Sequence, residues 1–320
     1  MSAKLARNGL GGSLVGLGLL FAVRSWADPV PILQYNFNEG GGATANSTGS
    51  DKTPLTMRDK SFNLPTDYHG GSGSGVTNAK GDNSFYNRPL GADKVTGYAD
   101  EPFVAAIDKL VSFTLTAWIA PSPQPIPATS VESLFFKFDS GAGFVLQAIP
   151  GGGAVNAKGF GLSLSVNGGT SSTLSIAYPY TAYDFIAVTY DGTAAADNVN
   201  FYLGLRGSGD TSEVTLVSTK TINQGQVGAV NKGLTIGSMP RGNSPFLGLM
   251  DDVNIFGTTK ANDASGVLSL AQLETLRKSE LAVPEPSSLV LVGTGLFVIA
   301  GIGAASRRRP ARQPHLLVAH

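Results

Sequence analysis

The chain has 320 residues, of which 42% are hydrophobic, 14% are charged and none is cysteine. The absence of cysteine excludes a disulfide framework, so any folded part is held by its core alone. Lysine and arginine together number 23, as do aspartate and glutamate, so the formal net charge is zero.

This balance hides an uneven distribution of charge. Seven basic residues lie in the two terminal segments, at Lys4, Arg7, Arg24, Arg307, Arg308, Arg309 and Arg312. The other 16 basic residues accompany 23 acidic residues, all between Asp28 and Glu285, so this part carries a charge near −7. A nucleic acid partner requires a basic face. The distribution argues against nucleic acid binding, and it is compatible with a soluble surface protein or a protein that binds divalent cations.

Residues 1–27 have the composition of a signal peptide. Basic residues precede an apolar run over residues 10–23. Ser25 and Ala27 are small residues at the two positions that a signal peptidase reads. We predict export, with cleavage between Ala27 and Asp28. The alternative is an anchor helix that is not removed.

The next 255 residues or so, 28–282, are enough for one large domain. The clearest pattern is at residues 111–120, where apolar residues alternate with Ser, Thr and Trp, as in a half-buried strand. Residues 40–81 are polar and glycine-rich, and we predict a long surface loop within the domain rather than a linker between two domains. Further strands are predicted at residues 32–37, 131–138, 143–149, 160–166, 173–177, 183–190, 199–205, 213–218, 234–237 and 246–256.

These short strands are separated by turn residues. Asn167-Gly168 and Asp191-Gly192 are typical hairpin turns. About a dozen short strands with such turns predict an all-β protein, an antiparallel β-sandwich.

One helix is predicted after the strands. Ser269 and Gln272 have the spacing of a capping box, and Leu268 and Leu273 that of a hydrophobic staple. The end of the helix, at Arg277-Lys278, suits the negative end of the helix dipole. The apolar face that we expect to lie on the sandwich consists of Leu270, Leu273 and Leu276.

The C-terminal segment contains a tripeptide, an uncharged stretch of 17 residues and an arginine cluster: Pro284, Glu285, Pro286, residues 289–305, Arg307, Arg308 and Arg309. As a helix, the uncharged stretch would be about 25 Å long. That length is near the short end for crossing a bilayer. By the positive-inside rule the arginines stay in the cytoplasm, so the chain before Val283 faces outward.

This order resembles the PEP-CTERM sorting signal of bacterial envelope proteins, over residues 283–309. In that family the tripeptide marks the region that an exosortase, a membrane-embedded transpeptidase-like enzyme, recognises and cuts. Two prolines also keep the segment extended and open to a protease. The alternative is an ordinary single-span anchor with a proline-containing stalk. Residues 310–320, a predicted cytoplasmic tail, extend past the point where such signals usually stop, and we assign them no role.

The predicted strands resemble a second family, the laminin-G-like jelly roll of the concanavalin A type. The predicted helix lies where that family places its last helix, and the resemblance extends roughly over residues 32–280. One departure is Tyr183-Asp184, which stands where the family has a Trp or another aromatic residue. The fold hosts lectins, adhesion modules, pentraxin-like binders and glycoside hydrolases, so it does not decide the function. The stretches that carry the resemblance are 113–119, 185–192, 199–204, 234–237 and 246–256.

Enzymatic activity is not predicted. A retaining glycoside hydrolase needs two carboxylates about 5 Å apart. Glu132 has no acidic neighbour two or four positions away. Asp251 and Asp252 are adjacent, so we expect them to point to opposite faces of a strand, with Asp251 in a structural role bonded to nearby backbone. The three histidines, in a loop and in the terminal tail, do not suggest a triad or a zinc site: His69, His315 and His320.

Calcium is the one cofactor that the composition allows, since it binds Asp, Asn and carbonyl oxygens on loops. Asp191, Asp197 and Asn198 bracket one hairpin turn, and Asp82 and Asn83 lie in another loop. Turns favour these residues in any protein, so no ligand is assigned.

Three tyrosines near a strand end have two possible roles, at Tyr178, Tyr180 and Tyr183. Exposed rings could stack on sugars. The alternative is packing in the core or in a loop.

We therefore predict an exported, non-enzymatic protein of the cell envelope or the extracellular matrix. It is anchored in the inner membrane before C-terminal processing and exposed or released afterwards. PEP-CTERM proteins generally accompany exopolysaccharide production, so the resemblance implies a carbohydrate-binding or adhesion module, with signal peptidase and exosortase as processing partners. The alternatives are a glycan hydrolase on the same fold and a structural matrix component.

Overall fold

The computed structural model describes residues 29–60, 63–87, 97–121, 130–150, 159–172, 176–177, 183–205 and 213–282. The predicted signal peptide, the Pro-Glu-Pro tripeptide, the uncharged stretch and the arginine cluster all lie outside these ranges. Within them, no helix combines the length and the hydropathy that a bilayer crossing requires.

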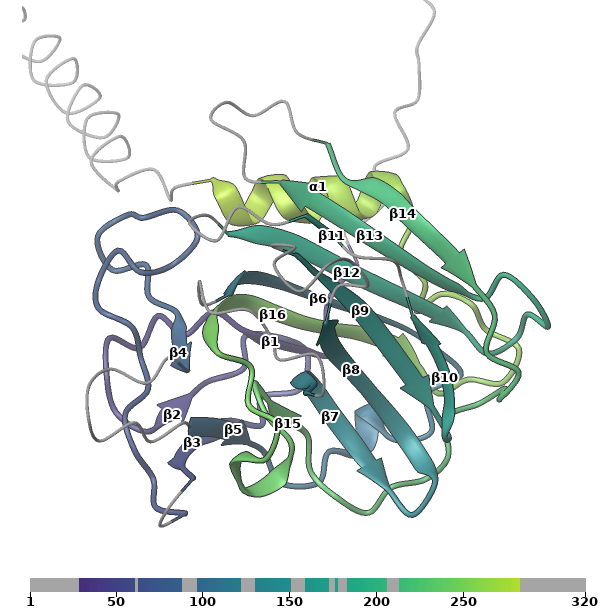
Figure 1. The fold of residues 1–320 in the computed structure, drawn as a ribbon, viewed down its shortest axis with the longest axis horizontal. Coiled ribbons are helices and arrows are strands. Elements are labelled where there is room, and N and C mark those ends of the chain that lie inside the picture. The colour runs from purple at the N-terminus through teal and green to yellow at the C-terminus, as the bar shows by residue number, and fades with distance from the viewer. Residues whose placement is uncertain are drawn as a thin grey trace, which may run out of the picture.

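The described strands form two antiparallel sheets that face each other, which confirms the predicted β-sandwich (Figure 1). The seven-stranded sheet has the order β1 (Leu33–Tyr35), β16 (Gly248–Thr258), β6 (Ser112–Pro121), β12 (Asp184–Asp191), β13 (Val199–Leu205) and β14 (Thr215–Lys220), and β4 (Phe85–Asn87) pairs with β16.

The nine-stranded sheet is built mainly from short strands around the long pair β7 and β8. Its order is β10 (Gly169–Ser172), β9 (Gly159–Val166), β8 (Ala142–Pro150), β7 (Glu132–Asp139), β15 (Thr235–Ile236), β5 (Gly97–Asp100), β3 (Leu55–Asp59) and β2 (Thr44–Ala45), and β11 (Ile176–Ala177) pairs with β9.

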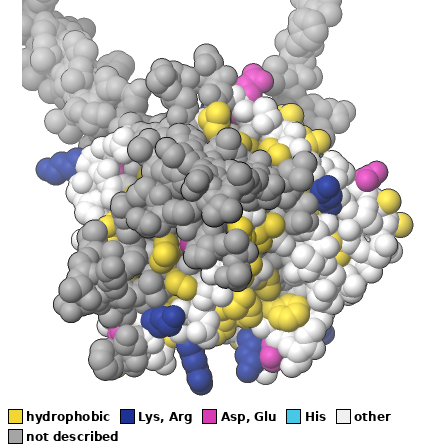
Figure 2. Space-filling view, in the orientation of Figure 1, with side chains coloured by type: hydrophobic (Ala, Val, Ile, Leu, Met, Phe, Trp, Pro, Cys, Tyr) yellow, Lys and Arg dark blue, Asp and Glu magenta, His cyan; other side chains and the backbone are white. Residues whose placement is uncertain are grey.

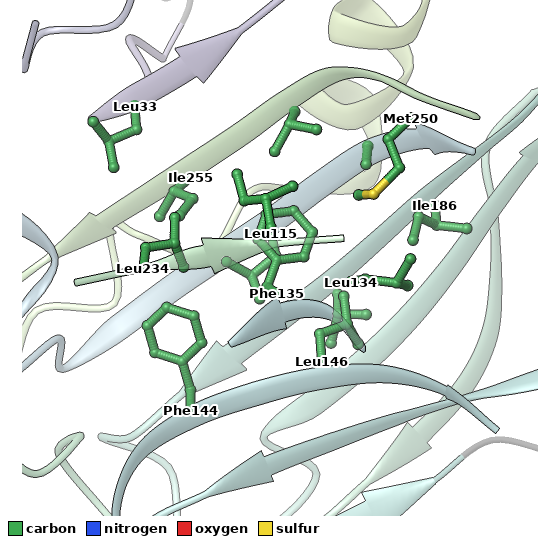
Figure 3. Packing of buried hydrophobic residues seen from close by; sticks show 14 of the residues in the cluster. Leu33, Leu115, Leu134, Phe135, Phe144, Leu146, Ile186, Leu234, Met250 and Ile255 are labelled. Atoms are coloured by element: carbon green, nitrogen blue, oxygen red, sulfur yellow. The ribbon is translucent and has the colours of Figure 1, made fainter. Parts of the chain in front are cut away.

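The core lies between the sheets and consists of the inward side chains of both. Figure 3 shows Leu115 and Ile255 of the seven-stranded sheet close to Phe135, Phe144 and other residues of the nine-stranded sheet. Each of these four side chains is at most 1% exposed. Full burial of such a side chain contributes about 1.5–3 kcal/mol, so in this cysteine-free chain the core supplies most of the stability.

The predicted loop over residues 40–81 is wrong in part, because β2 and β3 lie within it and extend the nine-stranded sheet. The alternation that marks β3 is short: Leu55, Met57 and Asp59 are buried while the residues between them are half-buried. β2 pairs with β3, and β3 joins the sheet through β5, about 40 residues further along the chain, which local pattern does not reveal. Of the strand predicted at residues 173–177, the structure describes Ile176 and Ala177, which form β11, and the strand β10 lies just before it.

β6 is buried on both faces, whereas its alternation predicted a half-buried strand. Ser112, Thr114 and Trp118 on the second face are all fully buried. The chain after β16 covers this face: Ser112 Oγ donates to the Asp263 carbonyl at 2.8 Å, and Thr114 Oγ1 donates to the Gly266 carbonyl at 2.7 Å. Small hydroxyl side chains suit a buried strand once backbone acceptors reach them.

Helix α1 (Leu270–Leu281) packs on this same outer face of the seven-stranded sheet. Leu273 is buried against Trp118 of β6, Phe185 of β12 and Tyr202 of β13. The predicted capping box is present: the Ser269 side chain accepts from the Gln272 amide, and the Gln272 side chain accepts from the Ser269 amide.

Two details of the predicted helix are wrong. Leu270 does not belong to the packed face, because it lies in the first turn, beyond the sheet, and is 46% exposed. The end predicted at Arg277-Lys278 falls short, because the helix runs to Leu281, although Lys278 does lie in its last turn. The Arg277 side chain is 1% exposed, and its Nε and Nη2 each donate to Glu274 at 2.8 Å. This double hydrogen bond to a carboxylate compensates for the burial of the arginine charge.

Two small 3-10 helices complete the described part, η1 (Ala105–Ile107) before β6 and η2 (Pro240–Gly242) after β15.

Candidate functional site

The outer face of the nine-stranded sheet carries two neighbouring aromatic rings on β7. Phe135 points into the core, so Phe136 and Phe138 point outward, opposite Val145 and Gly143 of β8. The two rings are partly exposed, with centroids 6.4 Å apart and planes at 74°. Figure 2 shows hydrophobic side chains gathered on this side of the molecule, over the place of β7 and β8 in Figure 1.

The rings border a cleft of about 420 Å³. Thr235 of β15 lies opposite Phe136, and Asp100 of β5 lies opposite Thr235, so three neighbouring strands supply one surface. The residues around the cleft are Asp100, Glu101, Phe136, Phe138, Asp139, Lys232, Gly233, Leu234, Thr235 and Pro240.

The charges of this cleft are nearly balanced. Asp100 Oδ1 is 2.7 Å from Arg58 Nε, in a pair that is about one third exposed. Asp139 and Lys232 are exposed and of opposite sign. The fifth charged residue, Glu101, is only 4% exposed. Aromatic rings beside polar side chains, without a strong net charge, suit a neutral ligand rich in hydroxyl groups.

A second cleft, of about 400 Å³, lies between α1, β16 and the loop before β4. Asp252 and Glu280 line it together with Asp82. The other residues around it are Gln34, Asn36, Asn38, Thr77, Ala79, Lys80, Gly81, Ser279 and Ala282.

Asp251 and Asp252 do not point to opposite faces of β16, as an unbroken strand would require. The register of β16 against β6 shifts between Asp251 and Asn254, which is a β-bulge, and Asp252 has a φ of +43°. Both carboxylates therefore reach the side of the sheet that α1 covers. The structural role predicted for Asp251 is confirmed, because its oxygens accept from the amides of Val76 and Asp252, both at 2.8 Å.

Glu280 brings a further carboxylate from α1. Its Oε2 accepts from Trp118 Nε1 and its Oε1 from Asn254 Nδ2, both at 2.8 Å. Burial, followed by the charge of Asp252, raises the pKa of Glu280 well above its usual range. Burial, followed by the charge of Asp82, raises the pKa of Asp252 to about 7. The cluster thus disfavours full ionisation.

Calcium would find oxygen ligands in this second cleft. Within the described ranges, however, no group of three or more His, Cys, Asp or Glu side chains is arranged to hold one metal ion. The carboxylates do not form a preassembled metal centre, and no step of the function is assigned to calcium.

Two of the positions considered for calcium at the hairpin turn, Asp191 and Asn198, form hydrogen bonds within the protein. Asp191 Oδ1 accepts from the amide and the hydroxyl of Thr193, at 2.9 and 2.6 Å. Asn198 bonds to the backbone of Ala194 and Ile222. These contacts stabilise the turn.

In the loop before β4, Asp82 accepts from the amide and the hydroxyl of Thr77, at 2.7 and 2.6 Å. Asn83 is buried, and its amide donates to Asn38 Oδ1 at 2.7 Å. Of the positions considered for calcium, only Asp82 lines the second cleft.

Tyr183 packs in the core rather than presenting its ring to a ligand. It is 4% exposed and its hydroxyl donates to the Ser74 carbonyl at 2.7 Å. Tyr178 and Tyr180 lie outside the described residues.

His69 lies between two carboxylates. Its Nδ1 is 3.0 Å from Asp67 and its Nε2 is 3.1 Å from Glu39. The carboxylates occupy opposite ring nitrogens, so they do not converge on one metal ion.

Sequence reasoning missed Phe136 and Phe138 as surface residues. Three consecutive apolar residues, Leu134-Phe135-Phe136, hide the alternation. A bulge between Ser133 and Phe135 also shifts its phase. The spacing of two between Phe136 and Phe138 was the available signal that they share a face.

The model of one protein family, described as the concanavalin A-like lectin/glucanases superfamily, matches residues 93–263. No curated protein matches the chain.

Solved structures with a similar fold include two botulinum neurotoxin binding domains. That of serotype G is 14% identical, with a TM-score of 0.49, and the match covers 78% of this chain and 51% of that one. That of serotype D is 11% identical, with a TM-score of 0.48, and the match covers the same shares. The match thus spans about half the length of these toxin domains.

A heptameric SAP-like pentraxin from Limulus polyphemus is 14% identical, with a TM-score of 0.38, over 54% of this chain and 73% of that one. The family match, unlike these distant likenesses, covers more than half of the present chain. The chain belongs to the concanavalin A-like lectin/glucanases superfamily.

Proposed function

We propose that this protein is an exported, non-enzymatic module that binds carbohydrate at the cell envelope, through the outer face of the nine-stranded sheet. The observation that carries the proposal is the pair Phe136 and Phe138, which stands beside a cleft of about 420 Å³ with charged side chains at its border. Sugar rings present apolar faces and hydroxyl edges. Exposed aromatic rings can pack against the faces, while the exposed polar side chains of Asp139 and Lys232 can bond to the edges.

The electrostatics of the cleft support a neutral polysaccharide as the ligand. Asp100 is neutralised by Arg58, and the exposed charges of Asp139 and Lys232 balance each other. The charge near −7 between Asp28 and Glu285 would also repel a polyanion.

The carboxylates beside the cleft support binding over hydrolysis. Asp100 is engaged with Arg58, and Glu101 accepts from the Tyr35 hydroxyl at 2.7 Å on the core side of the sheet, which leaves Asp139 as the remaining carboxylate at this cleft. A retaining hydrolase would require two such groups facing the ligand from about 5 Å apart.

Binding is tested with the full-length protein in detergent and two soluble probes, a neutral glucan and a polyuronate. We expect saturable binding of the glucan and weak binding of the polyuronate. The double variant Phe136→Ala/Phe138→Ala should weaken glucan binding by about tenfold, because each aromatic contact contributes roughly 0.5–1.5 kcal/mol. Leu216→Ala, on the distant edge strand β14 and 51% exposed in the native protein, is the matched control.

Three outcomes would contradict this proposal. Equal glucan binding by the double variant and the control would show that Phe136 and Phe138 do not contact the ligand. Loss of binding in a chelator would place a metal ion in the site. Release of reducing ends from the glucan would show a hydrolase.

We further propose that the C-terminal segment is a sorting signal cut by an exosortase. The order of Pro284, Glu285 and Pro286 before 17 uncharged residues and three arginines supports it. In the native host, Glu285→Ala should leave the protein in the inner membrane at its uncut mass, while Pro310→Ala, beyond the arginines, should be processed normally. Normal processing of Glu285→Ala would favour an ordinary anchor.

A further inference from the structure

A buried lysine lies at one end of the core. Lys137 of β7 lies between Phe136 and Phe138, which both point outward, so Lys137 points inward. Its side chain is 1% exposed. The Nζ atom is 2.8 Å from the Lys232 carbonyl, 3.2 Å from the Val230 carbonyl and 3.8 Å from Asp108 Oδ1. The ring of Phe103 lies 5.0 Å away. A cation in such a place is costly, because it has left water.

These contacts also suit a neutral amine. A neutral amine has two N–H groups and one lone pair. The carbonyls of Val230 and Lys232 can accept both N–H groups, which leaves the lone pair for the third neighbour, Asp108. Burial lowers the pKa of Lys137 from its usual value, while the charge of Asp108 acts in the opposite direction.

Asp108 is held in place beside Lys137 by a backbone hydrogen bond. Its Oδ1 accepts from the Val230 amide at 2.8 Å, and its side chain is 13% exposed. A backbone N–H on this oxygen would stabilise the negative charge that develops when a nucleophile adds to the carbon.

Glu101 supplies an acid beside this pair. Glu101 lies within electrostatic range of Lys137, its Oε2 accepts from the Tyr35 hydroxyl at 2.7 Å, and its buried Oε1 has no hydrogen-bond partner. Burial raises the pKa of Glu101 to about 8, so the group holds a proton at neutral pH. A buried neutral carboxylic acid can both donate and accept protons during a reaction.

We propose that Lys137 and Asp108 join in an intramolecular amide bond. Nζ adds to the carboxyl carbon of Asp108, the bond from that carbon to its second oxygen breaks, and this oxygen leaves as water. The ammonium and the carboxylate together lose one water molecule, so atoms and charges balance without an oxidant or a co-reactant. Glu101 passes the proton from the nitrogen to the leaving oxygen.

This cross-link goes beyond the proposed binding function and does not depend on it. It joins the end of η1 to the middle of β7, 29 positions apart in the sequence. In a chain without cysteine, an amide would constrain the unfolded state as a disulfide does in other exported proteins.

The test is tandem mass spectrometry of trypsin digests of the denatured full-length protein. We expect a branched peptide that contains Asp108 and Lys137 and is lighter by one water than its two parts. Trypsin should fail to cut after Lys137. A digest with only linear peptides and normal cleavage after Lys137 would overturn the proposal.

Two variants test the chemistry. Lys137→Arg keeps a cation but does not form the amide, so the branched peptide should be absent. Glu101→Gln keeps the shape of the side chain and should reduce the linked fraction at least tenfold. If Glu101→Gln is fully linked, Glu101 has no role in the proton transfer.

The exposed pair Lys260 and Asp263 is the matched control inside the same protein. Its Nζ to Oδ2 distance is 3.9 Å, but the lysine side chain is 81% exposed. It should stay unlinked, because a solvated ammonium is not a nucleophile. A link at this pair as well would identify both as products of the preparation and overturn the proposal.

Discussion

Trp118 Nε1 donates a 2.8 Å hydrogen bond to Glu280 Oε2, which ties the last helix to the seven-stranded sheet. Trp118 is fully buried on β6, and Glu280 lies one residue before the end of α1. Together with the 2.8 Å bond from Asn254 Nδ2 of β16 to Glu280 Oε1, it fixes the carboxylate at the end of the helix to the sheet.

Replacing this indole tests the attachment of α1. Trp118→Phe keeps a ring in the cluster but removes the donor, so the buried oxygen of Glu280 loses a partner. We expect the free energy of unfolding to fall by about 1–3 kcal/mol. Urea denaturation measures it. An unchanged midpoint at an unchanged slope would show that the bond adds nothing to stability.

Buried carboxyl groups should make stability depend on pH. Asp184 of β12 is 1% exposed, its Oδ2 has no hydrogen-bond partner, and burial raises its pKa from 3.8 to about 7. The folded state then binds more protons than the unfolded state between about pH 4 and pH 7. The free energy of unfolding should fall as pH rises through this window and level off above it.

The variant Asp184→Asn isolates this effect. It should be more stable than the native protein at pH 8, by on the order of 4 kcal/mol, and should differ little at pH 4. The unfolding free energy of the variant should still depend on pH, because other buried carboxyl groups remain, such as Glu132 with a pKa of about 7. Equal pH profiles for the two proteins would contradict the prediction.

The capping box of α1 is open to a direct measurement. Ser269→Ala removes the acceptor of the Gln272 amide and should cost about 1 kcal/mol of stability. Ser279→Ala, whose hydroxyl donates only to the Leu276 carbonyl within the helix, is the control and should change stability by less than about 0.5 kcal/mol. Chemical denaturation measures the free energy of unfolding of both variants. Equal losses of stability would show that the capping box does not stabilise the protein.

His69 should hold the loop at residues 39–46 in place. The ring is 2% exposed and contacts Glu39 and Asp67. Glu39 in turn accepts from the Asn46 amide at 2.5 Å, and Asp67 accepts from the Gly42 amide at 3.0 Å. Removing the ring leaves two carboxylates without their shared partner.

Amide hydrogen exchange measures this effect. In His69→Ala, exchange at Asn46 and Gly42 should become about tenfold faster or more, since tenfold corresponds to about 1.4 kcal/mol. Exchange in β6 should not change. His315→Ala, in the terminal segment, is the control. If Asn46 exchanges at the native rate in His69→Ala, the loop does not depend on His69 for its order.

Local pattern predicted the parts of this protein whose partners are near in sequence. The alternation at residues 111–120 located β6, and the spacing of Ser269 and Gln272 located the start of α1. Both signals depend on a few neighbouring residues. The all-β class also follows from the sum of many short alternating runs.

The candidate sites could not be predicted in this way. The outward direction of Phe136 and Phe138 depends on a bulge in β7, and the second cleft depends on a bulge in β16 that turns Asp252 towards α1. A bulge reverses the phase of alternation at one residue, and its sequence signal is weak.

The sequence by itself therefore determined the fold class, the position of the last helix and the charge distribution, because each depends on composition or on periodicity within one element. Only the tertiary structure decided which side chains meet. Lys137, Asp108 and Glu101 come from three separate segments and are brought together by the packing of the two sheets. Burial, which no residue reveals alone, then raises or lowers the pKa values that give such a group its chemistry.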